Sequence, residues 1–77
     1  MKKTAFVSGG TRGIGRACAE KLKSEGYQVI AGASGAFPND GEFNYIRCDI
    51  SNPEHRQQAL AYIENHYGRL ELLVNCA

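Results

Sequence analysis

The sequence has no tryptophan, only two prolines and almost no net charge. Its nine lysine and arginine residues are balanced by eight aspartate and glutamate residues, so the formal charge is +1. A chain this close to neutrality lacks the basic excess that draws proteins to nucleic acid or to anionic membrane surfaces. No apolar run approaches the roughly 18 residues that a membrane span needs. We therefore expect no nucleic-acid partner and no membrane segment.

Cysteines are also few. Cys18, Cys48 and Cys76 are odd in number and lie about thirty residues apart, which fits neither a disulfide framework nor a zinc site. We expect reduced and mostly buried thiols, because free cysteine is among the most buried residue types. The N-terminus lacks the long apolar stretch and the cleavage site of a secretory signal. These absences together predict a cytoplasmic protein.

What the chain does contain is typical of a small globular unit. Of its 77 residues, 43% are hydrophobic and 22% are charged, which is ordinary for a folded domain. Hydrophobic periodicity predicts strands over residues 4–8, 28–33, 43–48 and 70–75, and helices over residues 13–25 and about 52–67. Because strands alternate with helices, we expect an α/β fold with a parallel sheet, in the order β-α-β-β-α-β.

The same pattern assigns the boundaries and the buried faces of the helices. Gly26 suits a left-handed cap at the end of the first helix. The second helix begins with either a Ser51–Glu54 capping box or an Asn52 cap. Residues 34–42 are rich in turn formers and are predicted to be a loop. The expected buried stripes are Ile14, Ala17, Cys18 and Leu22 in the first helix, and Leu60, Ile63 and Tyr67 in the second.

The last predicted strand bears on the domain organisation. Residues 70–75 are nearly all apolar, which predicts a central strand, whereas residues 43–48 alternate and predict an edge strand. An apolar strand that ends the sequence leaves part of a sheet uncovered. We therefore expect residues 1–77 to be the N-terminal part of a single larger domain.

The most informative segment is the glycine-rich turn Ser8-Gly9-Gly10-Thr11-Arg12-Gly13-Ile14-Gly15, between the first strand and the first helix. Glycine permits the positive φ of a sharp reversal and lets a ligand approach the backbone closely. The helix N-terminus adds unpaired N–H groups and about half a positive charge, which suit a diphosphate. The turn lacks the G-x-G-x-x-G spacing, and Arg16 stands where a P-loop needs lysine. A purely structural turn is the alternative interpretation.

Three segments resemble the short-chain dehydrogenase/reductase family in their order and spacing. The glycine-rich turn resembles that family's Thr-Gly-x-x-x-Gly-x-Gly, with Ser8 in place of threonine. Cys48-Asp49-Ile50-Ser51 is similar to its aspartate segment after the third strand. Leu72-Leu73-Val74-Asn75-Cys76-Ala77 is similar to its Asn-Asn-Ala-Gly motif, with Cys76 in place of the second asparagine. The resemblance covers the whole chain and implies a Rossmann-type dinucleotide-binding fold.

The resemblance also implies which residues bind the dinucleotide. It assigns the adenine amino group to Asp49, for which a turn or capping carboxylate is the alternative. It places Asn75 at the same sheet edge, for which closure of the strand by backbone hydrogen bonds is the alternative. The candidate cofactor-binding residues are Gly9, Gly10, Thr11, Arg12, Gly13, Ile14, Gly15, Ser34, Asp49, Ile50, Asn75 and Ala77.

The residues favour NADP(H) over NAD. An NAD site usually places an acidic residue about 20 residues beyond the glycines, where it binds the ribose hydroxyl. The second predicted strand instead ends Ala31-Gly32-Ala33-Ser34, with no carboxylate. In the family's NADP-preferring members a cation at the position of Arg12 lies near the 2′-phosphate, and Ser34 would add a hydroxyl. A solvated surface cation is the alternative for Arg12.

The chain contains no recognisable catalytic group and no set of metal ligands. In the resembled family the proton donor is a tyrosine in a Tyr-x-x-x-Lys pair, and none of the four tyrosines here has lysine four residues later. His55 and His66 lie eleven residues apart without a third ligand, so we interpret them as surface histidines.

The expected function is therefore the NADP(H)-binding portion of a short-chain oxidoreductase. The resemblance implies hydride transfer between NADPH and a small-molecule carbonyl or alcohol, with a 3-oxoacyl thioester as the first candidate substrate. It also implies a homo-oligomeric parent enzyme. The alternative is a non-catalytic nucleotide-binding module or an inactive truncated gene product.

Overall fold

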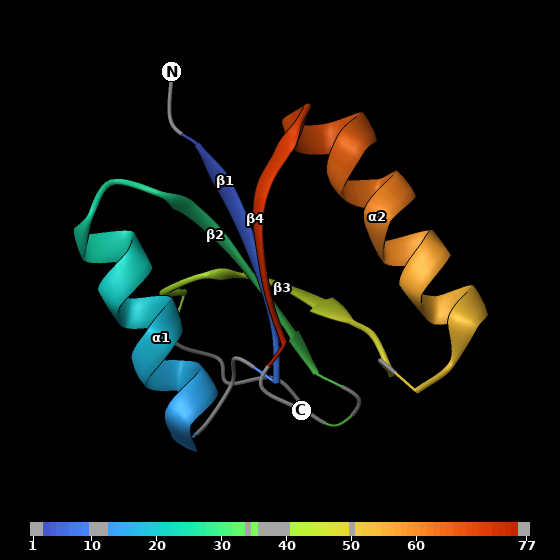
Figure 1. Ribbon diagram of the computed structural model, residues 1–77, viewed down its shortest axis with the longest axis horizontal. Coiled ribbons are helices and arrows are strands. Elements are labelled where there is room, and N and C mark those ends of the chain that lie inside the picture. The colour runs from blue at the N-terminus through green and yellow to red at the C-terminus, as the bar shows by residue number, and fades with distance from the viewer. Residues whose placement is uncertain (1–2, 10–12, 34, 36–40, 50, 76–77) are drawn as a thin grey trace.

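The computed structural model describes residues 3–9, 13–33, 35, 41–49 and 51–75 (Figure 1). The strands are β1 (Thr4–Ser8), β2 (Gln28–Ala33), β3 (Asn44–Arg47) and β4 (Leu70–Asn75). The helices are α1 (Gly13–Ser24) and α2 (Pro53–Tyr67). The predicted order of elements is confirmed, with boundaries that move by only one or two residues.

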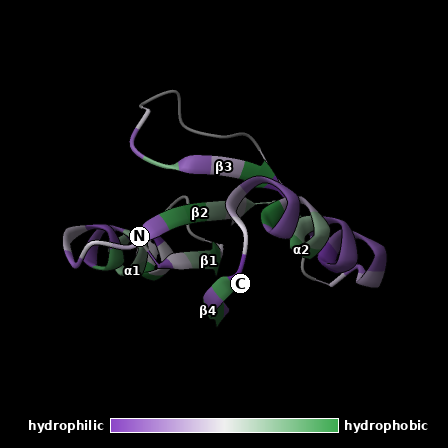
Figure 2. Ribbon diagram, turned by 90° about the horizontal axis from the view of Figure 1, so that it is seen from above, coloured by the Kyte–Doolittle hydropathy of each residue, from purple (hydrophilic) through white to green (hydrophobic). Residues whose placement is uncertain are grey.

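The four strands form one parallel sheet in the order β3-β2-β1-β4. Figure 2, which looks across the sheet from above, shows the two helices on opposite faces of it. Parallel strands joined by helices need a cover on both faces, because both faces are apolar. The protein therefore has the α/β Rossmann-like architecture that the sequence predicts.

Each face of the sheet has its own hydrophobic core. Successive side chains of a strand point to opposite faces, so neighbours in β1 belong to different cores. One core contains Phe6, Ile30, Cys48, Ala59 and Ile63 and lies under α2. The other contains Val7, Ala19, Val29, Ala31 and Phe43 and lies under α1. Every residue of β1 is buried, which makes this strand the centre of both cores.

The buried face of α1 agrees with the predicted one in part: Cys18 and Leu22 are half-buried, and Leu22 packs against the core. Gly15 and Ala19 are the buried residues, while Ile14 is 80% exposed and Ala17 is exposed. Arg16 is half-buried on the same helix. Gly15 and Ala19 are four residues apart and share one side of the helix. Two such small residues let the helix backbone lie close to the sheet. The buried face of α1 is therefore the face with small side chains and not the face with the most hydrophobic ones.

The face of α2 is shifted in the same way. Ala59 and Ile63 are buried, whereas Leu60 is 38% exposed and its predicted burial is wrong. Tyr67 packs half-buried against the core, as expected. Ala59 and Leu60 are both neighbours of Ile63 on the helix surface, at spacings of four and three, and only the smaller residue is buried.

The N-cap of α2 is Asn52, which decides between the two predicted caps. The Asn52 side-chain oxygen accepts hydrogen bonds from the backbone N–H groups of Glu54, at 2.9 Å, and His55, at 3.4 Å. The Ser51–Glu54 capping box is therefore wrong. The Ser51 hydroxyl is directed instead to Asp49.

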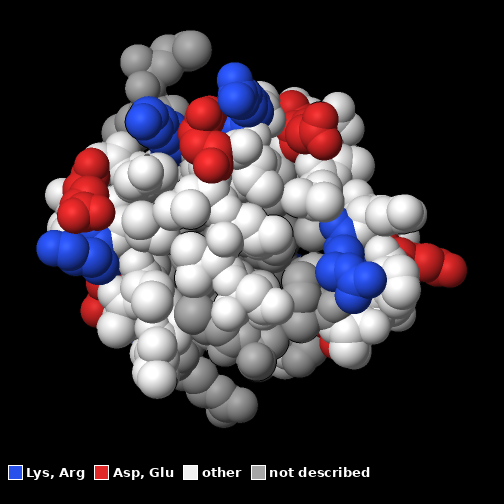
Figure 3. Space-filling view, viewed as in Figure 1, with Lys and Arg blue, Asp and Glu red and all other residues white. Residues whose placement is uncertain are grey.

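The position of β4 also corrects a prediction. It pairs with β1 alone and borders the sheet of the described residues, so it is not central here. Its side chains alternate between half-buried and exposed, and Leu73 is 52% exposed. Charged side chains gather around the rim of this side of the molecule and leave the middle uncharged (Figure 3). At the other edge, β3 is the predicted edge strand.

No helix in the described ranges combines the length and the apolar character needed to cross a bilayer.

Candidate functional site

The candidate site lies where the parallel strands end. Figure 1 shows the ends of β1, β2 and β4 at the same side of the sheet as the first turn of α1. In open α/β sheets, ligands bind in the crevice outside these carboxyl ends. Four described candidate residues lie at this edge: Gly9 follows β1, Gly13 begins α1, Asp49 comes shortly after β3, and Asn75 ends β4.

The turn from β1 into α1 depends on glycine at two positions. Gly9 has φ 70° and Gly13 has φ 64°, both in the left-handed region that other residues rarely adopt. The Gly9 N–H donates to the carbonyl oxygen of Gly32 at 2.8 Å, which ties the start of the turn to the end of β2. Of the predicted turn residues, Gly10, Thr11 and Arg12 lie outside the described residues.

The first turn of α1 suits an anion. It contains no acidic side chain, so no carboxylate competes for its N–H groups or opposes the positive end of the helix dipole. Gly15 is buried against the sheet and holds the helix close to β1. Ile14 extends into solvent instead of the core, which leaves its side chain free to contact a ligand at this edge.

Ser8 joins the ends of β1 and β4 and was missed by the sequence analysis. Its buried hydroxyl donates to the side-chain oxygen of Asn75 at 2.9 Å, and the carbonyl oxygen of Val74 lies 3.4 Å away. Ser8 and Asn75 are also register partners in the sheet. The Asn75 side chain therefore joins β4 to β1 through a side-chain hydroxyl, which differs from the predicted closure of the strand by backbone hydrogen bonds. Its exposed position at the edge leaves the binding interpretation open as well.

Asp49 occupies a tightly bonded turn between β3 and α2. One of its carboxylate oxygens accepts from the Ser51 hydroxyl at 2.6 Å and from the Ser51 N–H at 3.1 Å. These hydrogen bonds, with that from the hydroxyl the larger, lower the pKa of Asp49 below its ordinary value of 3.8. The carboxylate is therefore charged at neutral pH and held in one orientation. Its neighbour Ile50 lies outside the described residues.

The backbone of the same turn is held by His55. The Asp49 N–H donates to His55 Nδ1 at 3.1 Å, and the His55 ring is half-buried. The interpretation of His55 as a surface histidine is therefore wrong, whereas His66 is exposed as expected. No sequence pattern signals the His55 bond, because it links a side chain to a backbone group across a turn.

These observations place a glycine turn, a helix N-terminus and a fixed carboxylate at one edge of a parallel sheet. A model of the family described as short chain dehydrogenase matches residues 3–77. The chain belongs to the short-chain dehydrogenase family.

Individual relatives agree with this assignment. The chain is 34% identical over 77 residues to 3-oxoacyl-[acyl-carrier-protein] reductase MabA of Mycobacterium avium, an alignment that covers 100% of this chain and 30% of the relative. It is 33% identical over 87 residues to human 15-hydroxyprostaglandin dehydrogenase [NAD(+)], with 97% of this chain and 33% of the relative covered.

The structural likeness is equally close. Ligand-free aldohexose dehydrogenase (AldT) of Thermoplasma acidophilum superposes with a TM-score of 0.91 at 36% identity, covering 99% of this chain and 29% of that one. The chain spans about a third of the length of these proteins.

Members of the short-chain dehydrogenase family are oxidoreductases that use a nicotinamide dinucleotide. The residues observed at this sheet edge fit such a group: the backbone at Gly9 and Gly13 has the conformation that a close-approaching diphosphate needs. The Asp49 carboxylate, after the end of β3, offers a hydrogen-bond acceptor that β2 separates from the glycine turn after β1. Ser34 and Ala77, the remaining predicted contacts, lie outside the described residues.

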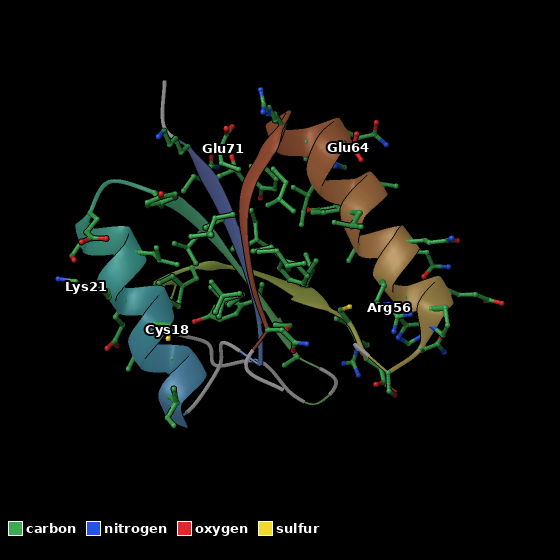
Figure 4. All side chains as sticks on the ribbon, in the orientation of Figure 1. Cys18, Lys21, Arg56, Glu64 and Glu71 are labelled. Atoms are coloured by element: carbon green, nitrogen blue, oxygen red, sulfur yellow. The ribbon has the colours of Figure 1, made fainter. Side chains whose placement is uncertain are left out.

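The cysteines of the described residues are unpaired. Cys18 and Cys48 are free cysteines, and Cys76 lies outside the described residues. Burial, followed by the nearby Asp49 carboxylate, raises the pKa of Cys48, so the thiol stays neutral. Cys18 lies on α1 (Figure 4). Across the described ranges, no three His, Cys, Asp or Glu side chains group as metal ligands.

Proposed function

We propose that residues 1–77 form the N-terminal, cofactor-binding part of a single Rossmann domain, and that this part binds NADP(H). The observation that carries the proposal is the glycine turn, in which Gly9 and Gly13 adopt positive φ directly before a helix whose first turn has no acidic side chain. Backbone N–H groups and the helix dipole then both favour the negative charge of a diphosphate.

The proposed contacts follow the length of a dinucleotide across the sheet edge. The diphosphate would lie on the glycine turn, the adenine amino group on the Asp49 carboxylate, and the far half of the dinucleotide beside the end of β4. Ser51 keeps the Asp49 carboxylate charged and oriented, which suits it to accept from an amino group. The proposed contact residues are Gly9, Gly10, Thr11, Arg12, Gly13, Ile14, Gly15, Ser34, Asp49, Ile50, Asn75 and Ala77.

The choice of NADP(H) over NAD rests on charge. The end of β2, Ala31-Gly32-Ala33, carries no carboxylate that would repel a 2′-phosphate or bind a free ribose hydroxyl. Arg12 in the glycine turn supplies a cation, and guanidinium binds phosphate well. One relative carries NAD(+) in its name, so the family as such does not determine this choice.

The reaction we propose for the whole protein is hydride transfer between NADPH and a small-molecule carbonyl, with a 3-oxoacyl thioester as the first candidate. The relative named as a 3-oxoacyl-[acyl-carrier-protein] reductase supports this substrate class. When bound, NADPH supplies the hydride. The residues of this chain bind the dinucleotide and orient it. None of its tyrosines has lysine four residues later, so the proton donor would come from another part of the enzyme.

Arg12→Ala tests the cofactor proposal in the intact protein. A lost charge-assisted hydrogen bond costs about 1.5–3 kcal/mol, so NADPH should bind roughly 10- to 150-fold more weakly. NADH has no 2′-phosphate and its affinity should change less than about threefold. Both affinities are measured by titration calorimetry.

Arg69→Ala is the matched control. Arg69 is an exposed arginine directly before β4, and it therefore lies at the amino end of this strand, away from the carboxyl ends where the candidate site lies. It should leave both affinities unchanged. Equal losses of NADPH and NADH affinity in Arg12→Ala would refute the NADP preference. Failure of the unmodified protein to bind either dinucleotide would refute the function itself.

A further inference from the structure

The two histidines of α2 use the same ring nitrogen in opposite ways. His55 Nδ1 lies 3.1 Å from the backbone nitrogen of Asp49, and because an N–H can only donate, this nitrogen must accept. His66 Nδ1 lies 2.9 Å from the carbonyl oxygen of Tyr62, so this nitrogen must donate. Protonation of the ring therefore preserves the hydrogen bond of His66 and abolishes that of His55.

His55 is held firmly enough to position what it contacts. It sits in the first turn of α2, where its own N–H donates to the Asn52 cap. Its carbonyl oxygen lies 3.7 Å from the Cys48 sulfur, at the end of β3. Both of these contacts hold the backbone of His55, and the residue is half-buried. From this fixed backbone the His55 ring reaches the Asp49 N–H through Nδ1.

The Asp49 turn is consequently held from two sides. Ser51 fixes the carboxylate, and His55 fixes the backbone N–H of the same residue. The backbone carbonyl of Asp49 also accepts from the Asn52 N–H at 2.9 Å. With both sides in place, the conformation of the Asp49 turn is fixed before any ligand arrives.

We propose that His55 is a positioning residue for the adenine half of the dinucleotide, and that it acts by holding the Asp49 turn in its binding shape only while its Nδ1 carries no proton. The inference rests on the proposed binding of a dinucleotide at this edge. His55 does not touch the ligand. It acts through Asp49, and its protonation weakens dinucleotide binding.

The charges around His55 support this direction of change. The Asp49 carboxylate faces it from the β3–α2 turn and interacts with it electrostatically. Glu54 and Arg56 flank it on α2, where Figure 4 shows Arg56 near the start of the helix, and the neutral Cys48 thiol lies at the end of β3. A protonated ring can no longer accept from the Asp49 N–H, and its positive charge attracts the carboxylate that the adenine would otherwise use.

Three variants of the intact protein test the proposal. Asparagine carries an oxygen at the position of Nδ1 and does not titrate, so His55→Asn should keep the hydrogen bond at every pH. His55→Ala removes the acceptor. His66→Ala makes the same change at an exposed position of the same helix and serves as the control. NADPH and NADH affinities are measured by calorimetry at several pH values between about 5.5 and 8, the range over which histidines usually titrate.

At pH 8 we expect His55→Ala to bind both dinucleotides about two- to tenfold more weakly, and His55→Asn and His66→Ala to bind them as the unmodified protein does. As the pH falls to about 5.5, the affinity of the unmodified protein should fall by a similar factor relative to the affinity of His55→Asn. The quantity compared at each pH is the ratio of these two affinities, from which the titration of the ligand phosphates cancels. A purely structural role of His55 would not produce a ratio that varies with pH.

A constant ratio between the unmodified protein and His55→Asn would overturn the proposal, and so would unchanged affinity in a folded His55→Ala variant. If His55→Ala does not fold by circular dichroism, the pH-dependent ratio remains decisive. Absence of dinucleotide binding by the unmodified protein at pH 8 is a separate result. It would overturn the proposed function and this inference together, whereas the first two results would leave the function standing.

Discussion

Replacing Gly32 by alanine should destabilise the protein, because the space for a β-carbon is already filled. A β-carbon at Gly32 would lie 2.6 Å from Cε1 and 2.8 Å from Cζ of Phe6. Phe6 is only 2% exposed and packs against Ile30 and Ile63 in the core beneath α2. The aromatic ring cannot move away without displacing those side chains.

The magnitude follows from two opposing effects. Forcing extra carbon into a well-packed core costs about 1–3 kcal/mol. Alanine also reduces the freedom of the unfolded chain, which stabilises the fold by about 0.4–1 kcal/mol. Gly35→Ala isolates the second effect, since no atom lies within 4 Å of a β-carbon there and Gly35 has no positive φ. The difference in unfolding free energy between the two variants should therefore be about 1–3 kcal/mol, with Gly32→Ala the less stable.

Urea unfolding followed by circular dichroism measures this difference in the intact protein. Phe6→Leu removes the Cε1 and Cζ atoms, so in the double variant the cost of Gly32→Ala should fall by at least about 0.5 kcal/mol. Equal stability of Gly32→Ala and Gly35→Ala, or additivity of Gly32→Ala with Phe6→Leu, would refute the reasoning. The Gly32 carbonyl also accepts from Gly9, so displacement of β2 should weaken dinucleotide binding as well.

Two further predictions concern the turn before α2. Asn52→Ala should lower the free energy of unfolding by about 1 kcal/mol through loss of the N-cap, measured by the same urea titration, and unchanged stability of this variant would contradict the assigned cap. The depressed pKa of Asp49 stabilises the fold fully above its ordinary value of 3.8, and this stabilisation is lost as the pH falls through the lower folded value. The stability of Asp49→Asn should therefore fall less steeply below pH 3.8 than that of the unmodified protein, and parallel acid-unfolding curves would contradict the assigned hydrogen bonds.

Local chemistry determined where the elements begin and end. Gly9, Gly13 and Gly26 all have positive φ, as their places at turns and helix ends predict, because the absence of a β-carbon is a property of the residue itself. The alternation of apolar and polar residues likewise predicted the order of strands and helices. Periodicity is a local property that survives without knowledge of any partner. The candidate residues Arg12 and Ser34 remain predictions from the sequence.

Only the tertiary structure decided which side of each element meets another. Hydrophobicity favoured Ile14 for the buried face of α1, but the small residues Gly15 and Ala19 are the ones buried, and Ile14 is 80% exposed. The Ser8–Asn75 hydrogen bond joins residues 67 positions apart, and the order of the strands decides whether they meet. The bond from Asp49 to His55 spans only 6 positions, yet it depends on the angle at which β3 leads into α2. Such contacts depend on how whole elements are placed relative to one another. The type of a residue and its spacing along the chain do not predict that placement.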